Sequence, residues 1–527
     1  MKFKKISKIF AGTLAIAMLL VSCSNSNNET TGETGTTTEN NSFIYAIDGD
    51  PGNSVNVITT NDRYGLMTIK AIYSPLYMYN VDGISYFLAE SMTPSEDKLT
   101  YTAKLREGVK WSDGTPFTAD DVVFTYNEML KEENAGSAYS QLIFNGKPLQ
   151  VNKVDDLTVE FILPEVSAPA MESLGGIYIM PKHIYEGETN FANSTKNATP
   201  VGTGPYVLDE YKSGQYVKFV KNENYFLDTA EIDEVYFRIV PDANTAKLAL
   251  QKGEVHALSV QSSDLADLVT EDSNLTAYAY EEGRVGNMIL NANSSKLQNA
   301  DFRKAIFYGI NRTDIINAAY GSEEYADPAY SFLPNSNEFN AKDSIEKYEY
   351  NPEKAKELLA SSGVTGVTLK FGYQANNVPQ QRQAAIIQQN LKEIGINVEL
   401  AAGEPNAIYQ QMENADTDYD MFLNGYIMGI DPDKYNALFI STSPSNFMHS
   451  NNPEVDRLFD LGRVETDTAK RQEIYTEIQK IIQDDAYFFP LLENKRIVVI
   501  NSSIKGVEDA KLVPIYTFED MSKLYFE

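Results

Sequence analysis

"VTLKFGYQANNVPQQRQAAIIQQNLKEIGINVEL", residues Val367–Leu400, decides the fold class of this chain. Its first residues, 367–373, alternate apolar and polar side chains, which is typical of a strand with one buried face. Pro379 can begin a helix after this strand, and Gly395 can end it. Between them an apolar stripe recurs at helical spacing, through Ala384, Ile387, Leu391 and Ile394. Because a second strand, 396–400, follows, the stretch predicts a βαβ unit with parallel strands.

The neighbouring segments extend this α/β pattern. "YDMFL", Tyr419–Leu423, is a further predicted strand. "NPEKAKELLASSG" predicts a helix with Asn351 as its N-cap, Pro352 at its first position and Gly363 as its stop. The region from about 292 to 499 is therefore predicted to be α/β.

The earlier half of the chain has a different pattern. "KLTYTAKL" (98–105), "DLTVEFIL" (156–163) and "GQYVKFVKN" (214–222) alternate strongly between turn residues, which predicts mixed sheets with hairpins. Near the end, an amphipathic helix is predicted for "RQEIYTEIQKIIQDD" (471–485). A strand is predicted within "NKRIVVINSSIKGVEDA" (494–510).

The N-terminal residues predict export and lipid attachment. Four lysines precede "IFAGTLAIAMLLVS", Ile9–Ser22, which is apolar or small throughout and too short to span a bilayer. The following "LVSC" resembles a bacterial lipobox, in which the cysteine is lipidated, and Cys23 is the only cysteine in 527 residues. Residues 1–22 are therefore expected to be a lipoprotein signal peptide, and 23–42, which are almost wholly polar, a disordered tether. The alternative is an ordinary signal with a chance cysteine.

The amino-acid composition limits the class of protein to which the chain can belong. The chain is 43% hydrophobic, so it can build large cores, and its net charge of −30 opposes binding to nucleic acid or anionic lipid. We expect contact with the membrane only through a diacylated, for example palmitoylated, Cys23.

Motifs that would indicate an enzyme are missing from the sequence. The three histidines, His183, His256 and His449, lie far apart, and there is no HExxH or GxSxG motif. "GTGPY", Gly202–Tyr206, lacks the third glycine of a dinucleotide loop and is interpreted as a structural turn. We therefore expect no catalysis, no cofactor and no metal site.

One long stretch resembles a known family. "KLREGVKWSDGTPFTADDVVFT" (104–125), inside Leu88–Leu130, resembles the signature of bacterial extracellular solute-binding proteins of family 5, the oligopeptide, dipeptide and nickel-binding group. Within it, Thr118 is predicted to cap a helix, and Trp111, the only tryptophan, to pack a turn rather than bind ligand. Further blocks resemble the family in order, at 201–226, 301–316, 351–359, 452–460 and 474–491, so the resemblance covers essentially 43–527.

The resemblance implies a large, three-part type II periplasmic-binding-protein-like α/β fold with mixed sheets and a hinge between two lobes. Lobe I would comprise about 43–75, 201–291 and 500–527, with 76–200 as an accessory part. Lobe III would be about 292–499, and chain crossings near 291 and 499 would form the hinge.

The implied function is that of a lipid-anchored receptor on the outer face of the cell membrane. It would be a monomer that captures oligopeptides in the interlobe cleft and delivers them to an ABC transporter permease. The alternatives are a non-peptide solute, such as a nickel chelate or a short oligosaccharide, or a surface sensor of peptide signals.

The ligand is expected beyond the carboxyl end of the strand 419–423, in the loop "NGYIMGIDPDKY" (424–435). The flexible, polarizable Met428 suits a permissive pocket. The alternative is an ordinary loop with Tyr426 and Ile427 in the core. The predicted ligand-binding residues are Asn424, Gly425, Tyr426, Ile427, Met428, Gly429 and Asp431, with Asp50, Gly52 and Asn53 from the first strand and turn of lobe I.

The partner of a peptide's amino group stays open at this point. Peptide binders of the family carry a tryptophan followed closely by an acid in this loop, whereas this chain has Tyr426 and, near the place of the acid, Gly429. Asp431 is the candidate for the amine. Asp431 followed by Pro432 also fits an N-cap and the first residue of a helix.

Overall fold

A computed structural model describes residues 41–527, apart from 54 and 272. The predicted signal peptide, Cys23 and all but the last two residues of the predicted tether lie outside the described residues. The first strand, β1 (Ser42–Ile47), begins at the last residue of that tether. Among the described residues, no helix has both the length and the apolar character needed to cross a membrane.

The predicted βαβ unit is confirmed. β16 (Thr368–Gln374) and β17 (Asn397–Gly403) pair in parallel, with Phe371 opposite Leu400, and α10 (Val378–Glu393) connects them. Asn377 caps the helix by accepting a hydrogen bond from the backbone N–H of Gln380, and Gly395 follows its end with φ +92°. That φ is costly for residues with a side chain, so glycine ends this helix.

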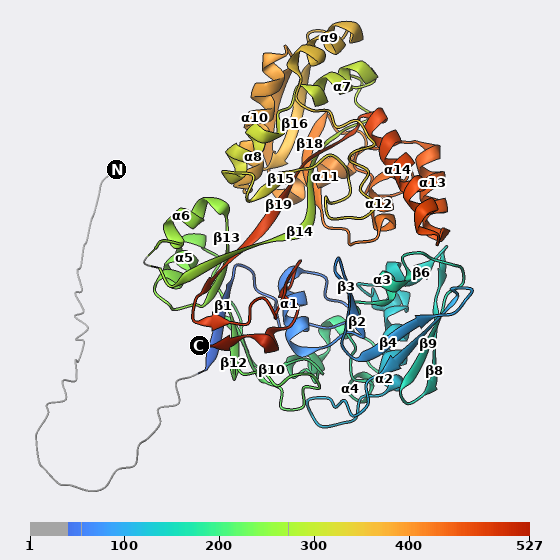
Figure 1. Cartoon of the computed structure of the whole chain (residues 1–527), viewed down its shortest axis with the longest axis vertical. Coiled ribbons are helices and arrows are strands. Elements are labelled where there is room, and N and C mark those ends of the chain that lie inside the picture. Colours follow the sequence, from blue (N-terminus) through green and yellow to red (C-terminus); the bar gives the residue numbers. More distant parts are fainter. Residues whose placement is uncertain (1–40, 54, 272) are drawn as a thin grey trace, which may run out of the picture. The chain divides into compact units, whose positions relative to one another are not determined.

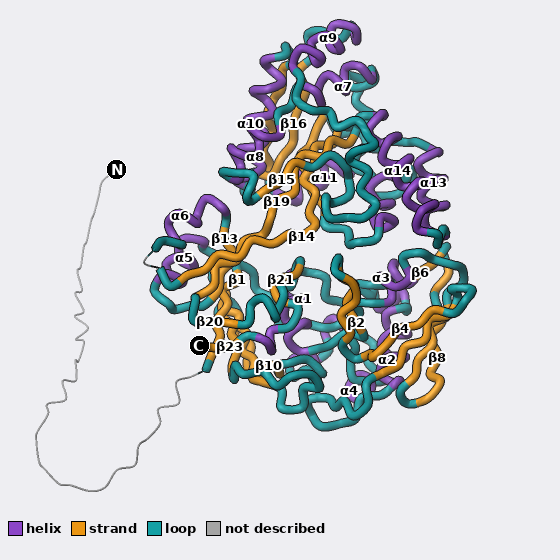
Figure 2. The backbone as a smooth tube through the Cα atoms, in the orientation of Figure 1, coloured by secondary structure: helices purple, strands orange, loops and turns teal. Residues whose placement is uncertain are grey.

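One large mixed sheet runs through the molecule (Figures 1 and 2). Its order is β10 (Tyr206–Lys212), β11 (Tyr216–Lys221), β12 (Glu234–Ile239), β1, β13 (Ala257–Val260), β19 (Phe488–Asn501), β14 (Leu275–Leu290), β18 (Met421–Tyr426), β16 and β17, with β15 (Ala326–Pro328) also pairing with β19. The two longest strands, β14 and β19, are antiparallel neighbours in its middle.

The hydrophobic cores divide along these two strands. One pair of clusters, here called the first core, contains residues up to Tyr280 and again from Val498 onward. The other pair, the second core, takes residues from Met288 to Leu492. Between them the β14–β19 register is irregular, from Glu281 to Val285. The chain therefore passes between the cores twice, along β14 and β19, just before the positions near 291 and 499 that the sequence suggested.

The family-like stretch supplies two strands and the covering helix of a four-stranded sheet. The sheet order is β4 (Ala89–Pro94), β5 (Thr100–Leu105), β9 (Thr158–Ile162) and β8 (Gln150–Asp155), and α2 (Ala119–Met129) follows β5. As predicted, Thr118 caps α2, in a capping box with Asp121. Trp111 is fully buried and packs edge-on against Phe117.

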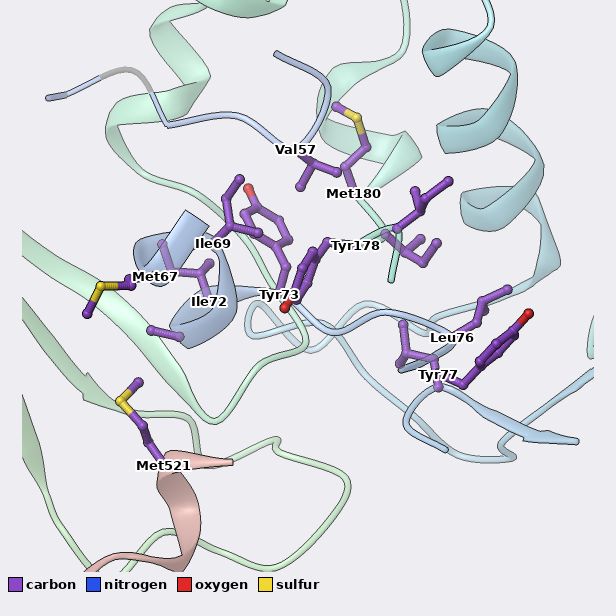
Figure 3. Packing of buried hydrophobic residues seen from close by; sticks show 14 of the residues in the cluster. Val57, Met67, Ile69, Ile72, Tyr73, Leu76, Tyr77, Tyr178, Met180 and Met521 are labelled. Atoms are coloured by element: carbon purple, nitrogen blue, oxygen red, sulfur yellow. The ribbon is translucent and has the colours of Figure 1, made fainter. Parts of the chain in front are cut away.

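The predicted "GTGPY" turn packs against the end of α1 (Arg63–Ile72). The Gly204 N–H donates to the Ile72 carbonyl at 2.7 Å, and a Cβ on Gly202 would lie 1.9 Å from that oxygen. Glycine is therefore required here by a close approach of two backbones. Figure 3 shows the apolar side chains around this helix, including Met67, Ile72 and Tyr178, which belong to the first core.

Further helices cover the second core's strands or flank them. They are α7 (Ala300–Tyr308), α8 (Arg312–Tyr320), α9 (Pro352–Ser362), α11 (Pro405–Glu413), α13 (Pro453–Val464) and α14 (Thr468–Asp485). Asn351 caps α9 and Gly363 ends it in the left-handed region, as predicted. On the first core's side lie α5 (Ala243–Gln251) and α6 (Leu265–Leu268).

Candidate ligand-binding site

The predicted ligand-binding loop leaves the end of β18. This strand pairs in parallel with β16 only at Met421 and Phe422, and antiparallel with β14 along its whole length, so its last residues have β14 as their only strand partner among the described residues. Asn424, Gly425 and Tyr426 are the last three residues of the strand, and 427–431 form the loop before a short 3-10 helix, Pro432–Tyr435. We call residues 427–431 the ligand loop.

Both polar and apolar side chains lie at the end of β18 and in the residues that follow it. The Asn424 side-chain amide donates to the Tyr426 hydroxyl at 2.8 Å. Burial raises the pKa of Tyr426, so its phenol stays neutral at physiological pH. Met428 packs, partly exposed, against the second core, and Ile427 is half-buried. The loop is thus only partly absorbed into the core.

Glu172, on α3 (Ala170–Leu174), reaches the ligand loop from the first core's side. Its two carboxylate oxygens accept the backbone N–H groups of Ile430 at 3.1 Å and Asp431 at 2.6 Å. Gly429 has φ +109°, and a Cβ there would lie 2.3 Å from a Glu172 oxygen. Burial raises the pKa of Glu172. We call these contacts the Glu172 bridge.

Two more contacts run beside this bridge. The Lys434 ammonium donates to the Ser173 hydroxyl at 3.1 Å, and the Ala168 N–H donates to the Arg463 carbonyl at 2.8 Å. The halves of the molecule that hold the two cores therefore touch directly at α3 and the ligand loop, away from the β14–β19 strands.

Asp431 already has strong partners inside the protein. It caps the 3-10 helix by accepting the Asp433 N–H at 2.9 Å, as the local interpretation expected. It also forms a bidentate ion pair with Arg471, at 2.7 and 2.8 Å, and both side chains are largely buried. Burial, and then the neighbouring Asp431 charge, raise the pKa of Asp433 to about 6. An amine role for Asp431 stays a prediction, and it would have to share this carboxylate with Arg471.

The three predicted residues of the N-terminal turn lie beside the β10–β11 hairpin. The exposed Asp50 carboxylate accepts hydrogen bonds from Gly52 N–H, Gly214 N–H and the Tyr211 hydroxyl, at 2.8 to 2.9 Å. Burial acts to raise the pKa of Asp50, but these hydrogen bonds hold it below its usual value. Gly52 and Asn53 line a cavity of about 240 Å³. Among the described residues, no hydrogen bond or ion pair joins this turn to the ligand loop.

A second cavity, of about 270 Å³, lies beside the end of β1 and is also lined by residues of β13, β14 and β19. Its lining includes Asp48, Tyr64, Glu282, Asn494 and Arg496. The Tyr64 hydroxyl donates to Asp48 at 2.5 Å. The buried Glu282 carboxylate is 3.1 Å from Arg63 and 3.8 Å from Arg496. We call this space the hinge cavity. It contains charges of both signs and lies between the cores.

Sequence reasoning missed the residues of the hinge cavity. A signal was present, because "EEGR" (281–284) and "ENKR" (493–496) place charges inside otherwise apolar strands. Charges in a central strand must find partners or a ligand. Their pairing across β14, β19 and α1 depends on the tertiary fold.

The histidines and acids offer no metal-binding cluster within the part of the chain that the structure describes. His183 contacts Asp113, His256 accepts a hydrogen bond from the Ile44 N–H, and His449 contacts the Met412 carbonyl. Each histidine therefore has its own partner in a different part of the structure.

Comparison with known proteins gives consistent matches. The family model described as "Bacterial extracellular solute-binding proteins, family 5 Middle" matches residues 83–448. The crystal structure of the ABC transporter substrate-binding protein CtaP from Listeria monocytogenes is 39% identical, with a TM-score of 0.89, over 92% of this chain and 99% of that one. The oligopeptide-binding protein AppA of Bacillus subtilis is 27% identical over 95% of both chains. The heme-binding protein A of Haemophilus influenzae is 29% identical over 96% of both chains.

Proposed function

The chain belongs to family 5 of the bacterial extracellular solute-binding proteins, and from this premise we propose that it captures oligopeptides between two lobes and delivers them to an ABC transporter permease. The proposed lobe I is 43–75, 201–291 and 500–527, with 76–200 as its accessory part, and lobe III is 292–499. The family membership confirms the resemblance that the stretch 104–125 carried in the sequence.

The observation that carries the peptide proposal is the ligand loop's backbone. The backbone N–H groups of Ile430 and Asp431 donate hydrogen bonds to the Glu172 carboxylate, which belongs to the opposite half of the molecule. Main-chain donors that face the opposite lobe can bind the backbone of an extended peptide. Such binding does not depend on the side chains of the peptide. Tyr426 and Met428 beside them suit side chains of varied shape.

Capture would use the irregular segment of β14 and β19 as the hinge. Only these two strands connect the two cores within the large sheet, and their register breaks between Glu281 and Val285. A ligand that contacts both lobes would favour the closed state by its extra contacts there. Closing around the peptide would shield its ends from water, which strengthens its ionic contacts.

We further propose that the receptor works outside the cytoplasmic membrane, held there by two acyl chains on Cys23. One chain binds a bilayer only marginally, whereas two bind it stably. Cys23→Ala should abolish incorporation of labelled fatty acid and release the protein from membranes. Label that persists in the variant would count against the anchor.

The peptide proposal is tested with the purified protein and a mixture of peptides of about two to ten residues, a span that exceeds the usual strand contact. Mass spectrometry should recover bound peptides with unchanged masses. Cleavage that follows the pure protein would support an enzyme instead. If no peptide binds, a non-peptide solute becomes the better proposal. The heme-binding relative motivates heme as a probe, and nickel chelates and short oligosaccharides complete the panel.

A sensor of peptide signals would bind the same ligands, so binding alone does not separate it from an importer. Uptake of a labelled peptide by cells, with and without the gene, makes the distinction. Loss of uptake in the deletion supports import, and unchanged uptake supports sensing.

A further inference from the structure

Arg284 lies in the irregular part of β14, between the two cores. The register with β19 breaks from Glu281 to Val285, and Gly283 within this break has φ +64°. Within the break, the Glu282 carboxylate contacts Arg63 and Arg496. Arg284 instead contacts β18, the strand that ends in the ligand loop, because Val285 and Gly286 pair with Tyr426 and Gly425.

The Arg284 guanidinium lies against the strand end at Gly425. A Cβ on Gly425 would lie 2.6 Å from the Arg284 Cζ, so any larger residue at 425 would push the guanidinium away. The position of the cation and the identity of residue 425 are therefore coupled.

Arg284 has unused capacity for hydrogen bonds. Its one described side-chain hydrogen bond goes to the neutral Asn494 side chain, at 3.3 Å from Nη1. Among residues 41–527, leaving out 54 and 272, it makes no ion pair, whereas Arg63, Arg471 and Arg496 each contact a carboxylate. A guanidinium has five donors in a planar fork that fits a carboxylate, and leaving a half-buried one unpaired is costly.

We propose that Arg284 binds a carboxylate of the ligand. The carboxylate can come from the C-terminus of a peptide or from an acidic side chain. On a chain with net charge −30, an unpaired cation beside the ligand loop is a local site of opposite sign. The assignment of this carboxylate to a peptide rests on the proposed function. The inference that Arg284 binds a carboxylate does not rest on it.

The test compares the wild type with Arg284→Gln and Arg284→Lys. Gln can still bond to Asn494, and Lys keeps the charge but loses the fork. Arg457→Gln is the matched control, because it removes the same charge from an exposed arginine on α13. Calorimetry measures binding of tetra-alanine with a free C-terminus, of its C-terminal amide, and of the amide with one glutamate. The two carboxylate peptides distinguish the sources.

The wild type should prefer at least one carboxylate peptide to the plain amide. Arg284→Gln should lose about thirtyfold in affinity for that peptide, as for a buried charge pair that loses one partner. It should change little for the plain amide, Arg284→Lys should be intermediate, and Arg457→Gln should match the wild type. Equal losses for all three peptides, or no loss, would overturn the inference while leaving peptide binding intact.

If no peptide binds the wild type, the peptide proposal fails and the Arg284 inference is decided separately. Acetate, succinate and citrate are then titrated in a thermal-shift assay with the same variants. A stabilisation of the wild type that Arg284→Gln loses and Arg457→Gln keeps would retain the inference. No Arg284-dependent stabilisation by any of the three would overturn it.

Discussion

Lys70 on α1 holds an amine in apolar surroundings within the first core. Its side chain is 7% exposed, and its Nζ has no hydrogen-bond partner among the described residues. The ammonium lies over the rings of Phe87, at 4.8 Å, and Tyr516, at 5.5 Å. Burial lowers the pKa of Lys70 from 10.5 to about 8. The charged form is thus less stable here than in the unfolded chain.

Lys70 should therefore make stability rise with pH over a defined window. Between pH 8 and 10.5 the folded protein has lost this proton while the unfolded chain keeps it, so the free energy of unfolding increases. Lys70→Met removes the effect and should stabilise the protein by roughly 2–3 kcal/mol at pH 7. Urea unfolding from pH 7 to 10 measures the difference, which should shrink toward pH 10. Parallel curves for the two proteins would contradict the assignment.

Asp431 is expected to matter for folding whatever its role toward ligand. Asp431→Asn keeps the helix cap but leaves Arg471 buried without its carboxylate, which should cost about 3 kcal/mol in the free energy of unfolding. Asp242→Asn is the control, because Asp242 caps α5 at an exposed position without an arginine. Chemical denaturation of both variants should show a loss for Asp431→Asn alone.

The same variant tests the amine role of Asp431. If its carboxylate also holds a peptide's amino group, Asp431→Asn should weaken peptides with a free N-terminus by roughly 2–5 kcal/mol and leave N-acetylated ones nearly unchanged. Calorimetric titration of both peptide forms into both proteins gives the comparison. Equal changes for the two forms would reject the amine role.

At the scale of elements, α1 and the "GTGPY" turn are joined by a close backbone approach. The turn's glycines bring its backbone onto the last carbonyl of α1, and β10 starts directly after it. α1 also carries Lys70, and Arg63 from its first turn pairs with Glu282 in the hinge cavity. The turn therefore fixes a helix whose first residues line the space between the cores.

Gly202→Ala should destabilise the protein strongly, by about 3 kcal/mol or more, because the new Cβ would lie 1.9 Å from the Ile72 carbonyl oxygen. Gly253→Ala is the matched control. Gly253 also lies in a turn, with φ +71°, and a Cβ added there would have no atom within 4 Å, so only the cost of the left-handed backbone, about 1 kcal/mol, is expected. Thermal unfolding compares the two. Similar losses would mean that the backbone approach is not tight.

For the whole molecule, the Glu172 bridge holds the halves together at a point far from the hinge in sequence. Glu172 and Ile430 of the ligand loop are 258 positions apart, and the bridge joins them by hydrogen bonds within the protein. A receptor closed by its own contacts would need to break them before it releases or admits a peptide. The bridge therefore favours the closed arrangement of the two halves.

Glu172→Ala should open the ligand-free protein. It removes both hydrogen bonds to the ligand loop, each worth roughly 1.5–3 kcal/mol to a charged acceptor, so the closed arrangement loses stability relative to the open one. Small-angle scattering should show a larger radius of gyration than in the wild type. Glu186→Ala, at an exposed acid on the same side, should leave the radius unchanged. An unchanged radius in Glu172→Ala would show that other contacts keep the molecule closed.

The sequence by itself determined the local structure and the fold class. Asn351, Thr118 and Gly395 were assigned to helix ends from their immediate neighbours, and the structure confirms all three. The βαβ unit at 367–400 could be predicted in the same way, because the periodicities of helices and strands depend on residues only a few positions apart. The family followed from the stretch 104–125, in which Thr118 caps α2 and Trp111 is buried.

Only the tertiary structure decided the partners in the candidate site. Asp431 and Pro432 predicted the cap correctly, but Arg471, 40 residues further on, had no local signal. The same holds for Glu172 against Gly429 and for Arg284 against Gly425. These contacts join strands, helices and loops that meet only after the large sheet has formed. These residues meet because segments distant in sequence come together, and no short-range sequence pattern indicates this. Helix caps and strand alternation, in contrast, depend on residues that are neighbours along the chain.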